Sequence, residues 1–367
     1  MKAFTMALRI AVAAVLAVFL VFAPPYLQQA LGHDYYREWL TGEREPWNGV
    51  LTLWHVVEFK TAQGSVTSYL ESVAAQYERA HPGVYIEVLG LSPEAVRERL
   101  SRGEHPHLWS FPMGECAAEQ FAPLTIEMPA FAGNIAPLQQ EGKIYAAPYM
   151  YSGYFLLGNT VLIQELGLAW PSDTATLADT LQQAMDARST GRYGAVCAPP
   201  LQAARLGLKG KMALDGDFKA SQVPFLIGDA RAFGDLSRKM ASGGFTFDAM
   251  PLGGFTEQVQ YIGIDSQASG GHAEHAAKFA SLLLGESAQR KVTALGAIPA
   301  VKLAEEPQFA DGQLQGFYKA YAAPVCPDPA LWQQARTAIG EEALAALGGG
   351  EEARRAFEEH LKAVMPG

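Results

Sequence analysis

The 367-residue sequence lacks the motifs by which many enzymes and nucleic-acid-binding proteins are recognised. It contains no GxSxG, HExxH or GxxxxGKS/T pattern and no GxGxxG after a predicted strand. The 28 Lys and Arg residues are outnumbered by 38 Asp and Glu residues, which gives a formal net charge of -10. They form no basic patch of the kind that a phosphate backbone requires. We therefore expect neither an enzyme nor a nucleic-acid-binding protein.

Cysteine is also scarce, with only Cys116, Cys197 and Cys326. No CxxC pair and no histidine pair at zinc-ligand spacing occurs, so we expect no metal and no cofactor. An exported protein could carry one disulfide. We choose Cys197 with Cys326, because both fall in the second lobe predicted below. The alternative is three buried cysteines that behave as small apolar residues.

The N-terminus has the layout of a signal sequence. Lys2 and Arg9 precede a wholly apolar run at 10–23, and Pro24-Pro25 follows. The cationic start stays inside, so the body of the protein is expected outside the cytoplasm. No cysteine is present before Cys116, which excludes the lipid attachment of a lipoprotein.

Residues 1–27 are long enough to cross about 30 Å of hydrocarbon. We favour an uncleaved anchor in the cell membrane, with secretion after signal cleavage as the alternative. The mixed, polar stretch 28–48 is interpreted as a tether between the membrane and the folded body.

Apolar runs alternate with helical stripes through the rest of the chain. The run at 50–57 predicts a buried strand, the stripe at 65–81 a helix that Ser65 caps and Pro82-Gly83 ends, and 84–89 a second strand. The crossover is long enough for parallel pairing. Further helices are expected at 93–102, 161–166, 177–188, 231–240, 272–284, 331–347 and 351–364, and strands at 107–111, 144–154, 223–227 and 253–265. This alternation is typical of an α/β protein.

Short motifs occur in a fixed order along these elements: Leu53-Trp54, His81-Pro82-Gly83-Val84, Gly142-Lys143-Ile144-Tyr145, Phe225-Leu226-Ile227-Gly228 and Gly296-Ala297-Ile298-Pro299-Ala300. Their order and spacing, from about Val50 to the C-terminus, resemble the extracellular solute-binding proteins of the maltodextrin-binding type, which serve ABC importers. In that family a longer helical stretch stands where this chain has only 194–222. The second lobe is therefore expected to be shortened.

The resemblance implies a two-lobed, periplasmic-binding-protein-like (Venus-flytrap) α/β fold with a hinge and an interlobe cleft. It places 50–145 and 255–303 in lobe one, and 150–250 and 305–367 in lobe two. It also implies that the protein, as a monomer, captures a small solute, with a sugar as the first expectation, and presents it to the membrane subunits of an ABC permease. The alternative, favoured by the shortened lobe and the missing lipid cysteine, is a membrane-tethered solute sensor or accessory protein.

Aromatic and polar side chains near strand ends are the candidate ligand contacts. Sugars stack on aromatic faces and are oriented by a few hydrogen-bonding groups, and parallel sheets bind ligands at the carboxyl ends of their strands. For the aromatic candidates, the alternative is plain packing in the core. The candidates are Trp54, His55, Glu58, Trp109, Ser110, Phe111, Tyr149, Tyr151 and Tyr154.

Overall fold

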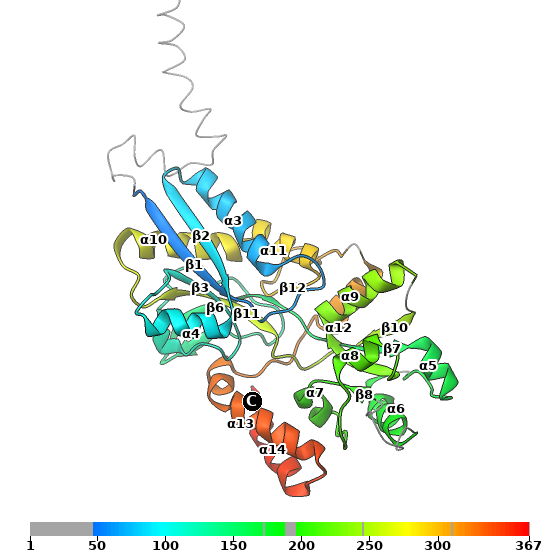
Figure 1. Cartoon of the computed structure of the whole chain (residues 1–367). Coiled ribbons are helices and arrows are strands. Elements are labelled where there is room, and N and C mark those ends of the chain that lie inside the picture. Colours follow the sequence, from blue (N-terminus) through cyan, green and yellow to red (C-terminus); the bar gives the residue numbers. More distant parts are fainter. Residues whose placement is uncertain (1–46, 172, 188–195, 244–245, 310, 367) are drawn as a thin grey trace, which may run out of the picture.

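The computed structural model describes residues 47–171, 173–187, 196–243, 246–309 and 311–366 (Figure 1). The predicted signal sequence or anchor at 1–27 and nearly all of the predicted tether at 28–48 lie outside these ranges. Within them, no helix combines the length and the apolar character needed to cross a bilayer.

The larger of two sheets has a parallel centre. In it β1 (Gly49–Val56) pairs in parallel with β2 and with β3. Antiparallel strands complete the sheet, in the order β12-β6-β11-β3-β1-β2, with β4 beside β11 and β5 beside β6. The other strands are β2 (Val84–Leu91), β3 (Leu108–Pro112), β4 (Phe121–Ala122), β5 (Leu138–Gln140), β6 (Lys143–Tyr151), β11 (Val259–Asp265) and β12 (Ile298–Pro299).

Helices cover both faces of this sheet (Figure 1). On one face α3 (Val66–Ala80), α10 (Gly270–Leu284) and α11 (Glu286–Lys291) share a core with alternate residues of β1. On the other face lies α4 (Pro93–Ser101). The predicted strand-helix-strand unit is confirmed: the Ser65 hydroxyl accepts a hydrogen bond from the backbone N–H of Ser68 at 3.1 Å, which caps α3.

The smaller sheet has the strand order β10-β7-β9-β8. Only β8 and β9 are parallel, so their carboxyl ends lie at the same edge. The strands are β7 (Tyr154–Asn159), β8 (Val196–Cys197), β9 (Phe225–Asp229) and β10 (Phe247–Pro251). The accompanying helices are α5 (Thr160–Glu165), α6 (Thr174–Ala187), α7 (Pro200–Arg205), α8 (Asp215–Lys219) and α9 (Ala230–Ala241).

Three helices end the chain: α12 (Gly312–Ala320), α13 (Pro329–Leu347) and α14 (Glu351–Ala363). Helix α12 belongs with the smaller sheet, because the Phe317 ring stacks on Phe155 of β7 with centroids 4.4 Å apart. Helix α13 contacts both bodies. Its start packs against the loop after β3, and the carbonyl of Leu347 at its end accepts a hydrogen bond from Gly210 at 2.8 Å. Two short 3-10 helices, Ala118–Gln120 and Val292–Leu295, lie in the larger body.

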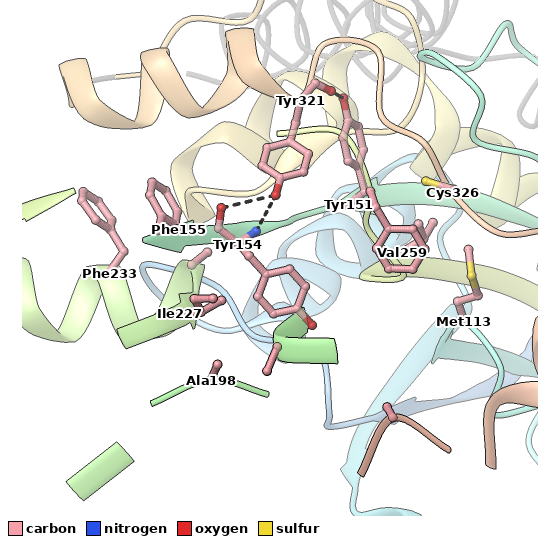
Figure 2. Packing of buried hydrophobic residues seen from close by; sticks show 14 of the residues in the cluster. Met113, Tyr151, Tyr154, Phe155, Ala198, Ile227, Phe233, Val259, Tyr321 and Cys326 are labelled. Atoms are coloured by element: carbon pink, nitrogen blue, oxygen red, sulfur yellow. Dashed lines mark hydrogen bonds between the residues drawn. The ribbon is translucent and has the colours of Figure 1, made fainter. Parts of the chain in front are cut away.

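The chain passes between the two bodies at 152–153, at 252–258 and after β12. Tyr321 joins these crossings (Figure 2). Its hydroxyl accepts from the backbone N–H of Tyr154 at 2.9 Å, and its carbonyl accepts from the hydroxyl of Tyr151 at 2.8 Å. Gly153 permits this contact, since a Cβ there would lie 2.2 Å from the Tyr321 ring.

The first described residue is fixed to the larger body. The Trp47 ring stacks on His275 of α10 with centroids 5.0 Å apart and meets His272 edge-on at 4.8 Å. His275 is buried, and its Nδ1 lies 2.8 Å from the hydroxyl of Tyr77 on α3. The described chain thus starts on the helices that cover the larger sheet.

None of the three cysteines forms a disulfide, and all three are buried. The predicted Cys197–Cys326 bridge is wrong because the two residues lie in different bodies. Cys197 is in β8 of the smaller sheet, whereas Cys326 lies beside Tyr151 and Tyr261 of the larger one. The alternative interpretation, of cysteines that behave as small apolar residues, agrees with the structure.

Candidate ligand-binding cleft

A cavity of about 410 Å³ lies between the two bodies, and we call it the interlobe cavity. The larger body contributes Lys60, from the loop after β1. The smaller body contributes the carboxyl ends of β8 and β9, where Ala198 and Asp229 stand, together with parts of α8 and α9. The volume falls in the range of small-molecule sites, and strand carboxyl ends are where open α/β sheets bind ligands.

Charged groups dominate the polar part of this cavity: Lys60, Lys219, Asp229, Arg231 and Asp235. Asp229 caps α9, because its Oδ1 accepts from the N–H of Ala232 at 2.9 Å. Burial raises the pKa of Asp229, while the N–H of Ala232 and the nearby Lys60 ammonium oppose that rise. Asp235 is paired with Arg238 at 2.5 Å.

The bodies touch beside this cavity, where α9 packs on the loop after β1. Arg238 Nη1 donates to the carbonyl of Ala62 at 3.1 Å. Gly234 makes the approach possible, because a Cβ there would lie 2.1 Å from the same carbonyl oxygen. Lys60 is therefore held close to the smaller body.

A second charged contact joins the loops after β1 and β3 to α13. Glu115 forms an ion pair with Arg336. The Glu58 carboxyl group lies close to that of Glu115. Burial, with the adjacent Glu115 carboxylate as a second cause, raises the pKa of Glu58.

A polar network lies at the hinge. The Tyr154 hydroxyl donates to Glu257 Oε1 at 2.5 Å, and Gln202 Nε2 donates to Glu257 Oε2 at 3.4 Å. Arg205 Nη1 donates to Gln202 Oε1 at 2.7 Å. Burial raises the pKa of Glu257, which the hydrogen bond from Tyr154 opposes. The adjacent Gln258 Oε1 is buried and has no hydrogen-bond partner.

Three of the predicted ligand contacts lie in the core of the larger body instead. The register of β1 and β3 places Trp54 beside Trp109. The two indole rings meet edge-on, with centroids 5.3 Å apart. Trp54 is 3% exposed and Trp109 is 1% exposed. Phe111 stacks between Phe121 and Tyr261. These rings do not project into the cleft, because α4 and the segment around Phe121 cover the face of the sheet on which they lie.

His55, Ser110 and Tyr149 form a buried network on the opposite face. Ser110 Oγ lies 3.0 Å from His55 Nδ1 and 2.7 Å from the Tyr149 hydroxyl, and Gln260 Nε2 donates to it at 3.0 Å. Burial lowers the pKa of His55 to about 4, although the hydrogen bond to Ser110 opposes this. These three residues also lie away from the interlobe cavity.

Of the nine predicted contacts, Glu58 and Tyr154 lie where the two bodies meet, and Tyr151 lies inside the hinge. Lys60, Asp229 and Arg231 were not among the predicted contacts, because the prediction rested mainly on aromatic rings near strand ends. A sequence signal for two of them existed, since Asp229 lies two residues after the predicted strand 223–227 and Arg231 begins the predicted helix 231–240. Among the described residues, no three His, Cys, Asp or Glu side chains are grouped as a metal site would require.

No family model matches the sequence, and no curated protein is similar to it. The structure, by contrast, is similar to solved sugar-binding proteins. The GacH receptor of Streptomyces glaucescens, solved unliganded and with acarbose, has a TM-score of 0.62 and 16% identity over 86% of this chain and 97% of its own.

Two further structures show the same similarity. The cyclic α-maltosyl-1,6-maltose binding protein of Arthrobacter globiformis has a TM-score of 0.64 and 15% identity over 87% of this chain and 99% of its own. The galacto-N-biose/lacto-N-biose I-binding protein of an ABC transporter from Bifidobacterium longum has a TM-score of 0.59 and 14% identity over 86% and 96%. The chain therefore has the two-lobed, periplasmic-binding-protein-like α/β fold, with a hinge and a cleft between its lobes.

Proposed function

We propose that the protein is the extracytoplasmic solute-binding component of an ABC importer, and that it binds a sugar in the interlobe cavity. One observation carries this proposal: a cavity at strand carboxyl ends that is completed by Lys60 from the other body. A ligand there contacts both lobes only when they are close together. Binding therefore shifts the population toward a closed form, which the permease subunits can distinguish from the open one.

The comparisons support the ligand class. The similar structures are binding proteins whose names specify oligosaccharides, and one of them belongs to an ABC transporter. In the same proposal, the protein acts as a monomer without catalysis, and its N-terminal segment holds it at the membrane. In this proposal the lobes comprise 50–145 with 255–303 and 150–250 with 305–367, although the segment around Cys326 in the last range packs beside Tyr151 and Tyr261 of the larger body. Lys60 and Arg231 are the candidate ligand contacts, whereas Glu58 and Tyr154 lie where the two bodies meet but outside the cavity lining.

Calorimetry of the full chain with a panel of neutral and charged mono- and oligosaccharides tests this function. At 100 times its dissociation constant, a ligand should stabilise the fold by about 2.7 kcal/mol, which a thermal unfolding scan detects independently. The sugar should be recovered unchanged after incubation. Absence of binding across the panel, or conversion of a bound sugar into a product, would contradict the proposal.

A cavity-filling variant links binding to the site. Ala198→Trp should abolish the calorimetric signal, because the indole occupies the space that a sugar ring needs. Lys143→Ala, at the exposed start of β6, provides the matched control and should bind as the unmodified chain does. Unchanged affinity in Ala198→Trp would place the ligand elsewhere.

A further inference from the structure

We propose that the bound solute is an anionic sugar, one that carries a carboxylate or a phosphate group. This inference rests on the proposed function and specifies the ligand of the same interlobe cavity. It follows from the charges around the cavity and from the side chains that are missing from its lining.

Three cationic side chains line the cavity from three separate elements. Lys60 comes from the loop after β1 of the larger body, Lys219 from the end of α8, and Arg231 from the first turn of α9. All three residues are exposed, so none is held inside the core. In a chain with a net charge of -10, the cavity lining holds these three cations against the two carboxylates of Asp229 and Asp235, a local excess of positive charge. Such local fields attract anionic ligands and raise their association rates.

The two carboxylates of the cavity already have partners. Asp229 accepts the backbone N–H of Ala232, and Asp235 pairs with Arg238, which lies outside the cavity lining. Arg238 therefore offsets the charge of Asp235, which leaves three lining cations against the single carboxylate of Asp229, near which Lys60 and Arg231 lie. Arg231 presents a planar fork of N–H donors, which matches the two oxygens of a carboxylate or the oxygens of a phosphate.

The lining offers no surface for stacking a neutral sugar. No Phe, Trp, Tyr or His is among the described residues that line the cavity. The rings expected to stack on a sugar, Trp54 and Trp109, are buried in the larger body instead. Recognition of a neutral oligosaccharide relies on such aromatic faces. With these absent, charge is the property by which this cavity can select its ligand.

The test uses the full chain and three monosaccharides that differ only at carbon 6: glucose, glucuronate and glucose 6-phosphate, with maltotriose as a larger neutral probe. We expect at least one anionic sugar to bind about tenfold or more tightly than glucose, a difference of about 1.4 kcal/mol. This preference should shrink as salt is raised. Glucuronate and glucose 6-phosphate distinguish a carboxylate from a phosphate ligand.

The possible outcomes distinguish failure of this inference from failure of the proposed solute-binding function. Binding of maltotriose or glucose with no gain for either anionic sugar would overturn the inference and leave the proposed function standing. Binding of none of the four probes would count against both. A preference for an anionic sugar that is independent of salt would also overturn the inference.

Variants of the lining residues test whether the preference for an anionic sugar arises in the interlobe cavity. Arg231→Gln and Lys60→Gln remove a charge and keep a hydrogen-bonding side chain, so each should weaken binding of the anionic sugar about tenfold more than it weakens binding of glucose. Lys143→Gln is the matched control and should change neither. Equal losses for charged and neutral sugars in Arg231→Gln would show damage to the cavity as a whole and contradict the inference.

Discussion

Trp109 is one of the largest fully buried side chains of the protein. Its Nε1 donates to Asp265 at 2.7 Å, and its ring packs on Trp54 and Phe121. Trp109→Ala should therefore reduce the free energy of unfolding by about 3–5 kcal/mol, measured by chemical denaturation. Glu58→Ala, at an exposed position on the neighbouring strand's loop, should change it far less. A loss below about 1 kcal/mol in Trp109→Ala would contradict the burial.

His55 should make stability depend on pH. Its pKa in the folded protein is about 4, against an ordinary value of about 6.5. Above pH 6.5 both states are neutral at this residue, so its contribution is constant. Between pH 6.5 and 4 the unfolded chain binds a proton that the folded one excludes, and the free energy of unfolding falls by up to about 1.4 kcal/mol per pH unit.

His55→Gln isolates this contribution. Other groups titrate in the same range, among them His275, whose pKa is also about 4, but they are common to both proteins. From pH 7 to pH 5 the variant should lose about 2 kcal/mol less of its free energy of unfolding than the unmodified chain. Parallel stability curves for the two proteins would show that His55 does not titrate as its burial requires.

Among elements, the hinge depends on the close approach of Tyr321 to the crossing between β6 and β7. Gly153→Ala places a methyl group into the Tyr321 ring, and should cost about 1–3 kcal/mol of unfolding free energy. Gly316→Ala in α12 is the matched control, because a Cβ there meets open space and alanine favours the helix. Similar effects of the two substitutions on the thermal midpoint would exclude a steric role for Gly153.

The ion pair between Glu115 and Arg336 connects α13 to the larger body. Glu115→Arg or Arg336→Glu alone brings like charges together and should separate α13 from the larger body. The radius of gyration should then increase, which small-angle X-ray scattering without ligand can measure. The double reversal restores opposite charges and should recover the original radius of gyration. If the double reversal is as expanded as either single variant, the pair does not hold α13 to the larger body.

At the scale of the whole molecule, the buried residues of the two core clusters, among those that the structure describes, begin at Leu51. A chain that begins at residue 45 should therefore fold, remain soluble without detergent and unfold at the same midpoint as the full chain. Circular dichroism checks the fold and the unfolding midpoint, and gel filtration checks solubility. Aggregation of this shorter chain, with the full chain soluble, would show that the N-terminal segment is needed for folding.

The sequence predicts the alternation of strands and helices because the signals for it are local. Ser65 caps α3, Pro82-Gly83 ends it, and both lie within a few residues of the helix. The hydrogen-bond partner of the Trp109 indole, by contrast, is Asp265, which is 156 residues away. Local patterns cannot show such a contact. For the same reason the search for aromatic rings missed Lys60 and Arg231, which approach one cavity from different bodies.

Elements without a strong apolar pattern were also missed, notably β10, α7, α8 and α12. Helix α8 has only five residues. Strand β10 is positioned by its pairing with β7, in which Phe247 lies opposite Asn159, 88 residues earlier in the chain. Their positions depend on the packing of the smaller sheet. The predicted pairing of Cys197 with Cys326 failed similarly, because it assumed that both residues were in one lobe.

The contact of Trp47 with His275 joins the start of the described chain to one of the two bodies. It fixes the start of the described chain to the larger body, so any pull exerted through the N-terminus acts on that body first. The smaller body is joined to it through the hinge crossings, α13 and the contact of Arg238 with Ala62. In the proposed function, closure moves Asp229 and Arg231 toward Lys60, which belongs to the body that Trp47 contacts. Under the proposed membrane attachment, the smaller body is the one that moves relative to the membrane.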